Sequence, residues 1–186
     1  MKGLRSQFMP TAVRIALILV AIAAVVAPSQ AATVVYNAGF AIGIQNLDVG
    51  GVNYNVDFID APYNTLYGAD LPVFFGNQPG ASAAADAIMN ALNAEPTVPE
   101  INNSPNEVLW VAYNVVGTDF LATQVGHNQS NLPWQRFGDF IGDRDTDWVP
   151  WYFAHFTAAQ VPEPASLSLV AVGLLALGFS ARKRNQ

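Results

Sequence analysis

The chain of 186 residues contains no cysteine. This absence excludes disulfide bonds, thiol nucleophiles, cysteine-ligated zinc, iron–sulfur clusters and a lipid anchor on an N-terminal cysteine. Histidine is scarce as well, because only His127 and His155 occur, far apart in the sequence. Two histidines at this separation form no recognisable metal-binding motif. A phosphate-binding loop and a dinucleotide-binding glycine fingerprint are also absent from the sequence.

Basic residues are scarce between the two ends of the chain. Residues 32–160 contain only Arg136 and Arg144 against thirteen acidic residues. A domain with this charge repels nucleic acid and anionic lipid headgroups, so neither is expected as a direct partner. This segment is long enough for one domain with a single hydrophobic core.

Residues 1–31 have the pattern of a secretory signal peptide. Three basic residues accompany an apolar run of twelve residues at 15–26. Ser29 and Ala31 are the small residues expected before a cut between Ala31 and Ala32. The alternative is an uncleaved transmembrane helix, but twelve residues rise only about 18 Å against a hydrocarbon core of about 30 Å. We therefore expect signal peptidase to remove residues 1–31.

Three stretches of the body have clear strand patterns. Residues 33–44 are rich in β-branched and aromatic residues and predict a strand. In residues 46–58, apolar and polar side chains alternate on both sides of Gly50-Gly51, which predicts a hairpin with a type I′ turn. Residues 107–116 are nearly all apolar and predict a central strand that is buried on both faces.

The rest of the body adds two strands and a helix. Residues 120–125 and 148–157 predict strands, and a proline within the second places it at a sheet edge or a bulge. Apolar residues at helical spacing predict a helix at 81–92. The segments 60–71 and 126–147 are rich in turn residues and are predicted as loops. This order of elements predicts an α+β fold, with a small antiparallel sheet and one packed helix.

Three aspartates form the sharpest ionic cluster of the body. Asp143, Asp145 and Asp147 stand at alternate positions, as acids do at the start of a calcium-binding loop. The sixth position of such a loop requires glycine and holds Trp148, and the twelfth requires an acid and holds Ala154. A solvated acidic loop is therefore favoured over a calcium site.

The remaining candidates for chemistry have weaker patterns. His127 and Ser130 have the types of a base and a nucleophile, but no Gly-x-Ser-x-Gly motif accompanies them. His155 lies in an apolar strand, where a core or edge histidine is expected. Thirteen carboxylates allow a glycosidase-like acid and base to be drawn, yet no pair is singled out. Four tryptophans have the shape to stack on sugars, although core packing is the default in a domain of this size. They are Trp110, Trp134, Trp148 and Trp151.

The C-terminal segment, residues 161–186, combines three features. Pro162-Glu163-Pro164 form a short box, residues 165–181 are almost all apolar, and Arg182-Lys183-Arg184 form a basic end. As a helix, the apolar run would rise about 25 Å, which is just enough to span a thin membrane. The basic end should then stay in the cytoplasm, with the body outside.

This combination resembles the PEP-CTERM sorting signal of Gram-negative bacteria. The resemblance implies recognition by an exosortase, a membrane transpeptidase-like enzyme, and processing near the Pro-Glu-Pro box. It also implies association with exopolysaccharide or biofilm matrix. In that reading Pro162, Glu163 and Pro164 are features of an enzyme's substrate and are not catalytic residues. The hairpin sequence at 46–51 is also similar to a stretch in uncharacterised proteins with this tail, which implies no activity.

Three segments are therefore predicted: a signal peptide at 1–31, an acidic α+β domain at 32–160, and a sorting signal with a transmembrane helix at 161–186. We expect export across the inner membrane, transient anchoring there, and a final place at the cell surface, outer envelope or extracellular matrix. The body is expected to have no catalytic activity and no cofactor. The alternatives are a carbohydrate- or calcium-binding module and a secreted hydrolase that uses carboxylates.

Overall fold

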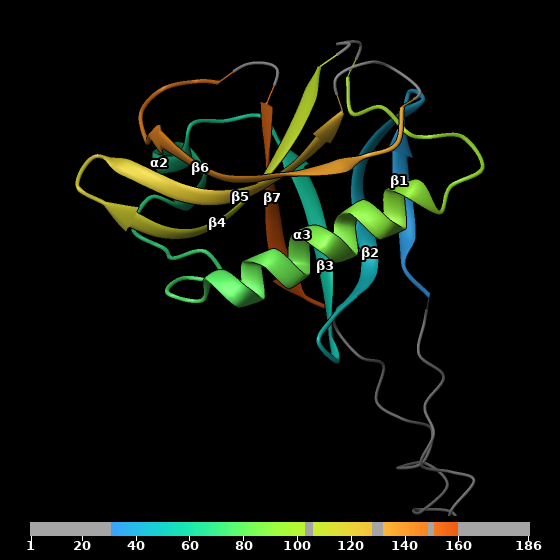
Figure 1. The fold of residues 1–186 in the computed structure, drawn as a ribbon, viewed down its shortest axis with the longest axis horizontal. Helices are drawn as coiled ribbons and strands as arrows, with labels where there is room; N and C mark the ends of the chain where they lie inside the picture. The colour runs from blue at the N-terminus through green and yellow to red at the C-terminus, as the bar shows by residue number, and fades with distance from the viewer. Residues whose placement is uncertain (1–30, 103–105, 128–131, 149–150, 160–186) are drawn as a thin grey trace, which may run out of the picture. The chain divides into compact units, whose positions relative to one another are not determined.

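The computed structural model describes residues 31–102, 106–127, 132–148 and 151–159. They fall within one unit, Gln30–Gln160. In this unit seven strands form one twisted sheet, and a long helix crosses one of its faces (Figure 1). The predicted signal peptide and C-terminal helix lie outside the described residues. In the part of the chain that is described, no helix combines the length and the hydropathy needed to cross a membrane.

The strand order in the sheet is β1-β2-β3-β7-β4-β5-β6. Hydrogen-bonded neighbours are antiparallel, except that β4 and β7 are parallel. The α+β prediction is confirmed in outline, but the sheet is larger than expected, and the parallel pair β4–β7 departs from the predicted antiparallel sheet. The strands are β1 (Thr33–Asn37), β2 (Phe40–Val49), β3 (Val52–Ile59), β4 (Glu107–Val116), β5 (Asp119–His127), β6 (Gln135–Asp143) and β7 (Trp151–Ala158).

The predicted hairpin joins β2 to β3. Val49 pairs with Val52, and Gly50 and Gly51 have φ angles of 63° and 88°, as a type I′ turn requires. The Asp48 carboxylate accepts a hydrogen bond from the Gly51 amide at 3.0 Å. The stretch predicted as a single strand at 33–44 is interrupted by a turn at residues 38–39 and gives β1 and the start of β2.

Replacing Gly51 by alanine should lower the free energy of unfolding by about 1–2 kcal/mol, because a Cβ atom disfavours its positive φ. A Cβ built at this position meets no atom within 4 Å, so the loss comes from backbone strain and not from a clash. Urea denaturation measures the change. Gly51→Asn is the matched control and should lose less, since asparagine tolerates this backbone region. Equal stability of the alanine variant and the parent protein would contradict the prediction.

The long helix is α3 (Gln78–Asn93), which contains the predicted helix at 81–92. It begins earlier than predicted because the Asn77 side chain accepts a hydrogen bond from the Gly80 amide at 3.0 Å and caps its first turn. The predicted apolar residues form its buried face, and their small side chains allow close packing on the sheet. They are Ala81, Ala84, Ala85, Ile88 and Leu92.

Two segments that were predicted as loops contain regular structure. The helix α2 (Tyr63–Tyr67) lies within 60–71, and β6 lies within 126–147. The α2 prediction failed because its two tyrosines, one turn apart, bury their rings against residues distant in sequence, with Tyr63 5.6 Å from Phe120. The β6 prediction failed because an edge strand buries little and leaves no alternating apolar pattern.

The last strand was predicted at an edge or a bulge, and this prediction was wrong. β7 occupies the centre of the sheet, between β3 and β4. The strand begins at Trp151, so Pro150 falls before its first residue.

Each face of the sheet has its own core. Leu109 and Val111 of β4 pack with α3 on one face, whereas the alternate residues Val108 and Trp110 face the other. The buried pattern of β4 confirms the predicted central strand. The second core consists largely of aromatic rings. Its members include Tyr63, Tyr67, Trp110, Phe120 and Phe153, with Phe140 and Trp148 packed against them.

Candidate functional site

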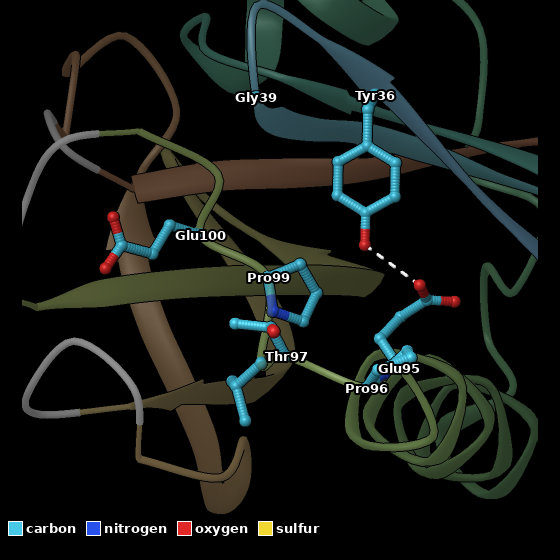
Figure 2. Close-up of a pocket in the computed structure, with 8 residues that line it drawn as sticks. Tyr36, Gly39, Glu95, Pro96, Thr97, Pro99 and Glu100 are labelled. Carbon is cyan, nitrogen blue, oxygen red and sulfur yellow. Dashed lines mark hydrogen bonds between the residues drawn. The ribbon is translucent and has the colours of Figure 1, made fainter.

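A groove of about 580 Å³ lies between the β1–β2 hairpin and the loop that follows α3 (Figure 2). This volume falls within the range of small-molecule binding sites, about 300–1,000 Å³. We refer to it as the Tyr36 groove and to residues 95–102 as its loop. Its lining residues are Tyr36, Gly39, Glu95, Pro96, Thr97, Val98, Pro99 and Glu100.

A hydrogen bond connects the two sides of the groove. The Tyr36 hydroxyl donates to Glu95 Oε2 at 3.1 Å, as Figure 2 shows. Partial burial, the hydrogen bond and the charge of Glu95 raise the pKa of Tyr36 above its usual range. The hydroxyl therefore stays protonated at neutral pH and remains a donor. The Tyr36 residue is 44% exposed, so its side chain is fixed at the tip but open to solvent.

Two hydrogen bonds connect the groove loop to the rest of the domain. The Trp134 indole Nε1 donates to the Pro99 carbonyl at 3.0 Å. The Ala41 amide of β2 donates to the Glu100 carbonyl at 2.8 Å. Together with the fixed φ of its prolines, these bonds restrict the conformation of the loop.

A buried carboxylate anchors the end of the loop. Glu107, the first residue of β4, accepts hydrogen bonds from the amides of Ile101 at 2.8 Å and Asn102 at 2.6 Å. His127 Nε2 lies 3.0 Å from Glu107 Oε2, and both side chains are fully buried. The Trp134 ring stands edge-on to the His127 ring at 4.7 Å. The interior of the domain thus holds a satisfied acid–histidine pair directly beneath the loop.

Glu107 therefore positions His127, although the sequence analysis did not single out this acid. Glu107 and His127 are opposite residues of the β4–β5 ladder. The sequence offered one signal for this pair. An acid begins β4 and a histidine ends β5, and two consecutive antiparallel strands bring these ends together. Ser130, the nucleophile candidate weighed with His127, lies outside the described residues. His155 is half-buried in β7 and lies 5.9 Å from the Tyr67 ring.

Two carboxylates of the acidic run at the end of β6 accept hydrogen bonds from other residues of the domain. Asp143 Oδ1 accepts hydrogen bonds from the Asp145 amide at 2.8 Å and the Thr146 hydroxyl at 3.2 Å, and Asp145 accepts one from Asn64. Partial burial and the charge of Asp147 raise the pKa of Asp60. Within the described ranges, no three acidic, histidine or cysteine side chains are grouped to hold a metal ion.

The tryptophans divide between core and half-buried positions. Trp110 and Trp134 are almost completely buried, which leaves no ring face for stacking on a sugar. Trp148 is half-buried and stands edge-on to Phe140 at 5.5 Å. The side chain of Trp151 lies outside the described part.

The Tyr36 groove contains two carboxylates, which a glycosidase-like mechanism would require. In Figure 2, the Glu100 carboxylate points away from Tyr36 and Glu95, so the two acids do not face a common point. This orientation does not favour a concerted acid–base pair.

Comparison with known proteins concerns the C-terminal tail. Residues 160–184 match the family described as the PEP-CTERM protein-sorting motif. The match covers the Pro162-Glu163-Pro164 box, the apolar run and the basic end, and it confirms the resemblance of the tail. No curated protein and no solved structure matches the chain. The similarity of residues 46–51 to an uncharacterised family stays a prediction.

Proposed function

We propose that the acidic body is a non-catalytic protein of the cell surface or exopolysaccharide matrix, since the PEP-CTERM motif makes this chain an exported substrate of exosortase. The motif match is the observation that carries this proposal. The signal peptide at 1–31 would start export. The apolar run at 165–181 would then hold the protein in the inner membrane until processing near the Pro162-Glu163-Pro164 box.

The absence of catalysis is supported by how the reactive side chains are used. His127 is buried against Glu107 beneath the groove loop, away from solvent. Glu95 is hydrogen-bonded to Tyr36, and the Glu100 carboxylate points elsewhere. These arrangements favour a binding or structural role for the body over acid–base chemistry.

The carbohydrate- or calcium-binding alternative differs from this proposal in one measurable property. A binding module should be retained on the polysaccharide of its own host, whereas a purely structural body should not. A pull-down with and without calcium separates the two. Absence of retention under both conditions would remove the binding-module alternative.

Replacing Glu163 by glutamine should block processing and leave the precursor in the inner membrane. The substitution removes the single charge between two prolines, which is the distinctive group of the box. Deleting residues 182–184 should have the same effect, because it removes the positive charges that fix the tail's orientation. We expect the processed fraction of each variant to be less than about a tenth of that of the parent.

Immunoblots of fractionated host cells measure precursor and product separately. Asp70→Asn is the matched control, since it removes one exposed carboxylate from the body and should be processed like the parent. Normal processing of both tail variants would refute the role of these residues in sorting.

A further inference from the structure

The Tyr36 groove concentrates negative charge. Glu95 and Glu100 line it, and none of its lining residues is basic. The 16-residue helix α3 ends at Asn93, two residues before Glu95, and its last turn contains no basic residue. A helix C-terminus carries a partial negative charge, which favours a bound cation. The Glu95 carboxylate and the C-terminus of α3 therefore both favour a bound cation.

An aromatic ring lies in this negative environment. The Tyr36 side chain remains partly exposed, while the hydrogen bond from its hydroxyl to Glu95 holds the ring in place. An organic cation over the face of a tyrosine is attracted by the ring quadrupole. The Glu95 carboxylate at the edge of the same ring offers a counter-ion, so one ligand group would contact both.

The dimensions of the groove favour an organic cation over a metal ion. A volume of about 580 Å³ suits a ligand of many atoms. A divalent metal requires several oxygen ligands around one point, and Figure 2 shows the two glutamates diverging. In the part of the chain that the structure describes, no group of three acidic, histidine or cysteine side chains meets this requirement.

The groove is also preformed. Its loop is fixed by the bonds from Trp134 to Pro99 and from Ala41 to Glu100, and by the bonds of Glu107 to the loop amides. A ligand would therefore pay little of the ordering cost that weakens binding to mobile loops.

We propose that the Tyr36 groove binds the ammonium group of an organic ligand, with Glu95 as counter-ion and the Tyr36 ring as the surface on which the ligand packs. The ammonium group occurs both on a lysine side chain and on an amino sugar, and the groove chemistry is the same for both. This proposal concerns the body and does not depend on how the tail is processed.

Calorimetric titration of the full-length protein in detergent micelles tests the proposal. The probes are Nα-acetyl-lysine methylamide and a glucosamine disaccharide, each compared with its N-acetylated form, which is neutral. We expect saturable binding of one or both ammonium probes, at least about tenfold tighter than of the acetylated forms. Binding should weaken as salt is raised, because the charges are near the surface. The stronger probe identifies the source of the ammonium group.

Single-residue variants test whether binding depends on the groove or only on the overall negative charge of the domain. Glu95→Gln keeps a hydrogen-bond acceptor for Tyr36 but removes the charge, and Tyr36→Ala removes the ring. Each should weaken binding of the preferred probe about fivefold to tenfold. Asp70→Asn removes an exposed carboxylate outside the groove and should bind like the parent. Unchanged thermal unfolding of the variants confirms that the loss of binding is local.

Three results would overturn the proposal. The first is no saturable binding of either ammonium probe, and the second is equal binding of the charged and acetylated forms. The third is saturable calcium binding that requires Glu95 and displaces the probes, which would make the groove a metal site. None of these results bears on the precursor assay with Glu163→Gln, so the two proposals fail separately.

Discussion

Replacing Glu107 by alanine is expected to lower the free energy of unfolding by about 3 kcal/mol or more, because each buried polar group that loses its hydrogen-bond partner costs about 1–3 kcal/mol. The carboxylate accepts hydrogen bonds from the Ile101 and Asn102 amides and contacts His127 Nε2 at 3.0 Å. All three interactions disappear together, in a place where the side chain is fully buried. The groove loop also loses its anchor, so ligand binding at the Tyr36 groove should weaken as well.

Chemical denaturation of the full-length protein, followed by tryptophan fluorescence, measures this loss. Glu107→Gln is the matched control, because it keeps the size of the side chain and one acceptor oxygen. It should lose clearly less than the alanine variant. An alanine variant within about 0.5 kcal/mol of the parent, the range of ordinary surface substitutions, would show that the pair contributes nothing to stability.

Replacing Trp110 by alanine is expected to cost about 3–5 kcal/mol, the usual range for removing a buried aromatic side chain. Trp110 is fully buried at the centre of the aromatic core. Its ring stacks on Phe140 with centroids 4.9 Å apart and contacts Phe120 and Phe153 at 5.1 and 5.2 Å. The neighbouring strands hold these rings in place, so the space that the indole leaves would not close.

The same denaturation experiment includes two comparisons. Trp110→Phe should lose less than the alanine variant, since it keeps part of the ring contact. Val116→Ala truncates a side chain at the exposed end of the same strand, where the residue is 61% exposed, and should change stability by no more than about 0.5 kcal/mol. Similar losses for Trp110→Ala and Val116→Ala would contradict the placement of Trp110 in a tight core.

The elements that were predicted correctly have patterns contained in their own residues. The alternation around Gly50-Gly51 and the alanine-rich face of α3 are local, and each leads to one structure. The apolar run of β4 likewise requires burial on both faces wherever the strand lies. The sorting tail was recognisable for the same reason, because its box, apolar run and basic end are contiguous.

The features that were missed depend on contacts between distant residues. β7 was misplaced because strand order is set by which strands pair, and Pro150 indicated only where the ladder begins. The partnership of Glu107 and His127 depends on the register of β4 and β5. The Tyr36 groove combines a hairpin with a loop much further along the chain, so no short window of sequence contains it.

If the C-terminal tail tethers the protein, as we propose, the central place of β7 has a mechanical consequence. Within the described sheet, the halves β1–β3 and β4–β6 are joined only through β7. The Ala159 amide donates to the Asn53 carbonyl at 3.0 Å, and the sorting motif begins at the next residue. Tension on the tail along the strand therefore acts on the ladders to β3 and β4 together, in shear. Many hydrogen bonds share the load, whereas a terminal strand at the sheet edge would peel away one bond at a time.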